Sequence, residues 1–249
     1  MTTSRSLVLT ASALVLLAGC GVSADEAQPE KRSFAFAQDR LSIAKGSGDL
    51  DIKPGDVTDV QVRRWFSRWS VLGGDPKTTW DLKDGTLTLA TDCVTLIGGC
   101  DVRYEVVVPA GTALTVEGDN GRVSASGFGA GLRIRTDNGA ISVADASGPL
   151  SLESENGEVR ATGTRSGQVD AVSGNGAIHL AFAAVPDQVA VRTDNGAVTV
   201  EVPDAAYQVK VKGGEDVRAD VREDATSRHV ITATSDNGRI TVRPAGPAS

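Results

Sequence analysis

One short segment, residues 63–69, holds the residue types that most often make binding contacts. It combines three arginines with two tryptophans and one phenylalanine. An exposed tryptophan beside an arginine suits stacking on sugar rings and charge-assisted hydrogen bonds to anionic wall polymers. Because side chains alternate along a strand, Trp65 and Trp69 share one face with Arg63. The candidate binding residues are Arg63, Arg64, Trp65, Arg68 and Trp69.

A second interpretation of this segment is a strand that closes one end of the fold. Arg64, Phe66 and Arg68 fall on the opposite face from the tryptophans. In such a strand the tryptophan rings are buried, and the arginine stems cover apolar surface. The sequence leaves both interpretations open.

The chain offers little material for catalysis. Neither His179 nor His229 has an acid or nucleophile at a motif spacing, and no nucleophile elbow, phosphate loop, His-Glu-x-x-His or Cys-x-x-Cys is present. We therefore expect no enzymatic activity, no cofactor and no metal. The formal net charge of −7, from 25 basic and 32 acidic residues, also argues against a nucleic-acid partner.

The first 20 residues contain a secretion signal. Arg5 supplies a positive charge, and the apolar run from Leu7 to Leu17 is too short to span a bilayer. The run ends in Leu-Ala-Gly-Cys, which resembles the lipobox of bacterial lipoproteins. That resemblance implies cleavage before Cys20 and lipidation of its thiol with acyl chains such as palmitate. We expect a signal peptide at 1–19, a flexible tether at 20–32, and a lipid-anchored protein on the extracytoplasmic face of the cell membrane.

Cys93 and Cys100 are the other two cysteines. Thiols oxidise outside the membrane, so a short-loop disulfide that pins an excursion at 92–101 is expected. Six residues separate the two cysteines, which is a wider spacing than that of a catalytic dithiol.

An internal repeat dominates the second half of the chain. Asn-Gly recurs at intervals of 18, 18, 19, 20 and 42 residues, and apolar residues stand six and four before each Asn and three and five after it. The period-two alternation predicts two short strands per repeat. Both residues of each pair tolerate the positive φ of a tight turn, and Gly has no Cβ to clash. The repeat turns are Asn120-Gly121, Asn138-Gly139, Asn156-Gly157, Asn175-Gly176, Asn195-Gly196 and Asn237-Gly238.

Two all-β architectures fit this pattern. In a parallel β-solenoid each repeat of 18–21 residues is one coil, and the Asn residues stack at successive corners. In an antiparallel hairpin array or sandwich, each Asn-Gly is a two-residue turn. The near-constant period favours the solenoid. Because the last interval is about two repeats long, a loosened copy without Asn-Gly is expected near Glu215.

The run from Leu132 to Val143, with Thr-Asp-Asn-Gly at its centre, resembles a bacterial β-strand-repeat family known as "putative adhesins". The segment Val106 to Thr112 resembles the entry to that family's repeats. The resemblance covers residues 105–243 well and 33–104 loosely. It implies a β-helical fold at the cell surface and carries over no catalytic or binding residues.

A file of acidic residues precedes the turn asparagines: Asp119, Asp137, Glu155, Asp194 and Asp236. Stacked carboxylates about 4.8 Å apart repel unless they are solvated or neutralised. Calcium is one candidate counterion, but neighbouring arginines are the favoured partners. These are Arg122, Arg135, Arg192 and Arg239.

We expect one β-repeat domain at 33–243, with an irregular aromatic-rich front end or cap at 33–104, regular repeats at 105–243 and a tail at 244–249. Its predicted function is that of a membrane-anchored lipoprotein with an adhesin-like binding or structural domain, and its partner is an envelope polymer or protein. The alternatives are an accessory protein in envelope-stress sensing and a β-helical carbohydrate-active enzyme.

Overall fold

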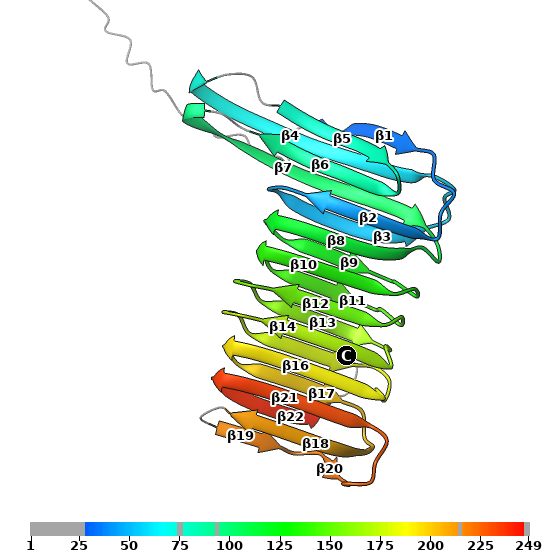
Figure 1. Ribbon diagram of the computed structural model, residues 1–249, viewed down its shortest axis with the longest axis vertical. Coiled ribbons are helices and arrows are strands. Elements are labelled where there is room, and N and C mark those ends of the chain that lie inside the picture. The colour runs from blue at the N-terminus through cyan, green and yellow to red at the C-terminus, as the bar shows by residue number, and fades with distance from the viewer. Residues whose placement is uncertain (1–27, 74–76, 93–94, 214–215, 247–249) are drawn as a thin grey trace, which may run out of the picture.

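The computed structural model describes residues 28–73, 77–92, 95–213 and 216–246. These residues form a β-solenoid with two 11-stranded sheets, in which the strands of each sheet run across the long axis (Figure 1). Most neighbouring strands are parallel, as stacked coils require. The predicted parallel solenoid is confirmed, and the alternative hairpin array is wrong.

The first sheet, sheet A, holds one strand from nearly every coil. In spatial order its strands are β1 (Glu30–Phe34), β4 (Val60–Gly73), β7 (Thr95–Pro109), β3 (Asp49–Gly55), β9 (Val123–Ser126), β11 (Ile141–Ala144), β13 (Val159–Thr164), β15 (Ile178–Phe182), β17 (Val198–Val202), β22 (Arg239–Pro244) and β19 (Asp216–Ala219).

The second sheet, sheet B, packs against it. In spatial order its strands are β20 (Arg222–Glu223), β18 (Ala206–Gly213), β21 (Val230–Asn237), β16 (Gln188–Asn195), β14 (Gln168–Ser173), β12 (Leu150–Ser154), β10 (Leu132–Asn138), β8 (Ala113–Asn120), β2 (Arg40–Lys45), β6 (Thr86–Asp92) and β5 (Lys77–Lys83).

The core lies between the sheets and follows the repeat. The residue six positions before each turn Asn is paired in register from coil to coil and is at most 3% exposed. Period-two alternation thus places every second side chain inside. This file is Leu114, Leu132, Leu150, Val169, Val189 and Ile231.

The coils follow chain order in the middle of the stack and depart from it at both ends. The last coil in sequence, β21 and β22, lies between the β16–β17 coil and the β18–β19 coil. The β2–β3 coil likewise separates β6 and β7 from β8 and β9. The copy expected near Glu215 is therefore the β18–β19 coil at the end of the array, although Glu215 itself lies outside the described residues.

Two local expectations for the front third need correction. Residues 95–101 are not an excursion, because they belong to β7 and pair antiparallel with β4. The predicted tether ends earlier than residue 32, because β1 begins at Glu30. The signal peptide, Cys20 and Cys93 lie outside the described residues, so cleavage, lipidation and the Cys93–Cys100 disulfide stay predictions. No helix in the described ranges could cross a lipid bilayer.

Candidate functional site

The candidate segment 63–69 lies on β4, near the N-terminal end of sheet A. Strand alternation separates its side chains, because Val60, Val62 and Arg64 are buried while Arg63 is exposed. The arginines therefore do not form one basic patch. Arg68 is exposed, and Trp69 pairs through its backbone with Gly99.

On the outer face, Trp65 is half-buried and lies opposite Arg103 of β7. The Arg103 guanidinium carbon is 5.2 Å from the centroid of the Trp65 ring, within the range of a cation–π contact. Arg103 Nε also donates a hydrogen bond of 3.1 Å to Asp51 Oδ2. Trp65 is thereby held beside a row of polar side chains.

The same outer face carries a second set of charges around Glu105. Its carboxylate lies 3.6 Å from Arg63 Nη1 and 3.4 Å from Lys53 Nζ. These exposed pairs contribute little to stability. Asp51, Lys53, Arg103 and Glu105 also line a shallow hollow of about 460 Å³, whose floor continues over serines of β9 and β11. The result is a polar surface next to an aromatic ring.

On the inner face, Arg64 is only 6% exposed and closes the end of the stack. Its Nη2 donates a 2.7 Å hydrogen bond to Glu30 of β1, and its guanidinium lies 4.5 Å from the centroid of the Trp80 ring. Its Nε and Nη1 have no hydrogen-bond partner in the described structure. Burial also raises the pKa of neighbouring Tyr104. The buried residue here is thus Arg64, where the cap interpretation expected buried tryptophan, and Trp65 is only half-buried on the outer face.

The turn asparagines form a continuous ladder at one edge of the solenoid. Each amide nitrogen donates to the amide oxygen of the preceding Asn in the stack, over 2.8–3.0 Å. The ladder spans the Asn residues at 138, 156, 175, 195 and 237. Asn237 bonds directly to Asn195, so the interval of 42 residues along the chain is a single step in the stack.

Of the two predicted reasons for glycine after these asparagines, the missing Cβ holds and the positive φ does not. Of the six turn glycines, only Gly121 has a positive φ. Close stacking is the cause instead: a Cβ on Gly139 would lie 2.2 Å from the carbonyl oxygen of Gly121, well inside van der Waals contact. The expectation that positive φ selects glycine throughout was wrong.

A buried hydroxyl file, missed in the sequence analysis, reinforces each corner. The residue two before the Asn donates through its side chain to the carbonyl of the preceding turn glycine, over 2.9–3.0 Å, in four coils. These donors are Ser154, Ser173, Thr193 and Ser235. The recurring Ser/Thr-x-Asn-Gly pattern was a visible signal for them.

Arginines neutralise part of the acidic file. Arg135 Nη2 lies 3.3 Å from Glu155, and Arg192 Nη2 lies 2.6 Å from Asp194 and 3.6 Å from Asp236. Arg239 pairs instead with Asp216, at 3.0 Å. Among the described residues, no three or more His, Cys, Asp or Glu side chains converge as metal ligands would.

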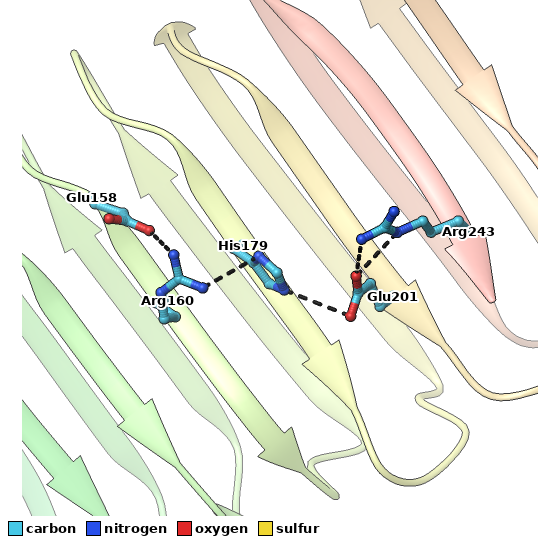
Figure 2. A network of polar contacts seen from close by, with 5 residues as sticks. All are labelled: Glu158, Arg160, His179, Glu201 and Arg243. Carbon is cyan, nitrogen blue, oxygen red and sulfur yellow. Dashed lines mark hydrogen bonds and ion pairs between the residues drawn. The ribbon is translucent and has the colours of Figure 1, made fainter. Parts of the chain in front are cut away.

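His179 lies on the outer face of sheet A, in a network that crosses four strands (Figure 2). Its Nδ1 is 3.4 Å from Arg160 Nη1, and its Nε2 is 3.7 Å from Glu201, which Arg243 also binds. Arg160 pairs with Glu158 at the other end. His179 thus contacts charged side chains of the strands on either side, and the network links successive coils.

One solved structure shares this fold, and a second is similar to the chain over most of its length. A "putative adhesin" from Bacteroides fragilis is 14% identical, covering 90% of this chain and 100% of that chain, with a TM-score of 0.52. A "putative adhesin" from Parabacteroides merdae is 12% identical, with 88% and 98% covered and a TM-score of 0.49. No curated protein sequence matches the chain.

Residues 29–243 match the family model described as Toastrack DUF4097. The match begins next to β1 and ends within β22, so it includes the regular coils and both ends that depart from chain order. The predicted resemblance to a β-strand-repeat family is thereby confirmed, and the chain belongs to the Toastrack DUF4097 family.

Proposed function

We propose that this chain is a lipid-anchored surface protein whose solenoid binds an envelope polymer or protein and performs no catalysis. Its Leu-Ala-Gly-Cys sequence supports the anchor, and likeness to the "putative adhesin" from Bacteroides fragilis supports a role in contact with external partners. Acyl chains on Cys20 would supply membrane affinity, at about 0.8 kcal/mol per buried CH₂ group.

The observation that carries the binding role is the half-buried Trp65 ring beside the hollow. An aromatic face can stack on a sugar ring, while Asp51, Glu105 and the serine floor can accept or donate hydrogen bonds to hydroxyl groups. Arg63 and Lys53 both form ion pairs with Glu105, which offsets their positive charge. This face therefore suits a glycan of low charge better than a strongly anionic polymer.

Two variants test the proposal. Trp65→Ala should lower retention of the purified chain on isolated cell-envelope polymer, while Thr199→Ala, an outward residue on β17 of the same sheet, should leave it unchanged. Cys20→Ala should release the protein from the membrane fraction, as measured by fractionation and intact mass. Equal retention of Trp65→Ala and Thr199→Ala would reject the binding face, and an unmodified amino terminus downstream of Cys20 would reject the anchor.

A further inference from the structure

A groove runs along the outer face of sheet B, on the other side of the molecule from Trp65. Three adjoining hollows of about 510, 300 and 580 Å³ form it. The first two share Arg133 and Ser151, and the last two share Gln168 and Gln188. Pro149 lines all three. The hollows are therefore one channel parallel to the stacking axis.

Two rows of outward residues shape this sheet B groove. In one row Thr115, Arg133, Ser151 and Asp170 are neighbours in parallel register. In the next row Gln168 pairs with Gln188, after the small residues Ala113 and Gly131. The short side chains in both rows form the floor of the groove, and the longer polar side chains project from it into solvent. The groove is thus a consequence of the order of side chains along the stack.

The groove carries hydrogen-bonding groups that the protein itself leaves unused. Arg40 and Arg133 are exposed, and their side chains make no ion pair or hydrogen bond within the described residues. Arg228 lies at the far end, where its Nε is 3.4 Å from His229 Nε2. Three arginines outnumber the two aspartates of the lining, Asp170 and Asp187, and with two glutamine amides they could bind hydroxyl and carboxylate groups of one extended ligand.

The spacing of the coils selects the class of ligand. The groove crosses seven strands of sheet B, from β2 to β21, so its length is about 29 Å at about 4.8 Å per coil. An extended peptide advances only about 3.3 Å per residue and would fall out of step with the coils. One pyranose unit of a linear glycan is close to one coil in length, so successive sugars would lie over successive strands.

We infer that the sheet B groove binds a linear glycan that bears carboxylate groups, with its chain along the stacking axis and about one sugar unit per coil. Each coil contributes weak polar contacts, and affinity arises from their number. This site uses none of the residues around Trp65 and is independent of the proposed role of that face.

Oligogalacturonides from dimer to decamer test the inference by calorimetry with the full mature chain, and neutral oligoglucosides of equal length serve as comparison. Affinity for the acidic series should rise with length and level off at about six or seven sugar units, which match the length of the groove. The neutral series should bind more weakly at each length. Equal affinity for dimer and hexamer would overturn the inference, as would binding of extended poly-glutamate without binding of the glycans.

Variants locate the site. Arg133→Ser gives that position the short hydroxyl side chain that its neighbour Ser151 has, and it should weaken hexamer binding about tenfold, the loss of one charge-assisted hydrogen bond. Arg222→Ser, at an exposed arginine outside the groove, is the matched control and should have no effect.

Ser151→Trp should block the channel while the melting temperature is retained, and Trp65→Ala should leave hexamer affinity unchanged. Wild-type binding by Ser151→Trp, or an equal loss in Trp65→Ala, would overturn the assignment.

Discussion

Lys45 lies directly opposite Gly118 in the parallel pairing of β2 and β8, and a Cβ on Gly118 would be 3.3 Å from Lys45 Cγ. These positions belong to the same file as the buried hydroxyls, because Gly118 pairs with Thr136 and Thr136 with Ser154. The Lys45 ammonium donates to the carbonyl oxygens of Asn120, at 2.6 Å, and Gly46, at 3.1 Å. One long side chain thus fills the space of a missing hydroxyl, and glycine at 118 leaves room for it.

Lys45 should make stability depend on pH in the alkaline range. Burial lowers the pKa of Lys45 from 10.5 to about 8, although Asp49 and Asp119 partly oppose the shift. Between about pH 8 and 10.5 the unfolded chain binds more protons than the folded one, so the free energy of unfolding rises with pH there. The Lys45→Met variant should lack this rise. Urea titrations of both proteins from pH 7 to 10 would show it, and parallel curves would contradict it.

Gly139→Ala should destabilise the protein by about 1–3 kcal/mol, because the added methyl group overlaps the Gly121 carbonyl in the coil beside it. Gly131→Ala is the matched control, since its Cβ would meet nothing within 4 Å. Chemical denaturation measures both. Equal stability of the two variants would show that stacking distance does not select glycine at the corner.

The asparagine ladder predicts a graded response. Asn156→Ala removes two ladder bonds, one to Asn138 and one from Asn175, while Asn138→Ala removes one. At about 0.5–1 kcal/mol for each exposed amide bond, Asn156→Ala should cost roughly twice as much as Asn138→Ala. The melting temperatures of the two variants provide the comparison, and an equal decrease would argue against a ladder of additive bonds.

Adjacent arginines on β4 should behave differently. Arg64→Ala removes a buried stem, an ion pair and a contact with Trp80, and should cost about 2 kcal/mol or more. Arg63→Ala removes a pair whose arginine side chain is 51% exposed, and should change stability by less than about 0.5 kcal/mol. If Arg64→Ala unfolds at the same denaturant concentration as Arg63→Ala, the cap assignment for Arg64 fails.

The regular coils could be predicted from sequence because local pattern and tertiary pairing coincide there. Aligning the chain on Asn placed Leu132 beside Leu150 and Ile141 beside Val159, which is their pairing in the sheets. The inward position of Arg64 was also accessible, since it shares strand parity with the apolar Val60 and Val62. In each case the period-two rule was sufficient.

The ends and the groove could not be predicted in the same way. Spacing along the chain gives the length of a coil but not its position in the stack, so the 42-residue interval between Asn195 and Asn237 predicts two steps where the structure has one. The sheet B groove depends on which outward residues become neighbours, and only the three-dimensional register brings Arg133 beside Ser151 and Gln168 beside Gln188.

The order of coils at the two ends constrains how this protein could have grown. Because β22 lies between β17 and β19, and β3 lies between β7 and β9, the coils at both ends of the stack are interleaved, although the first strand, β1, is itself the edge strand of sheet A. Copies of the unit can be gained or lost only between β8 and β17, where chain order and stack order agree (Figure 1). Relatives of different length should therefore differ in the number of central units and retain both interleaved ends.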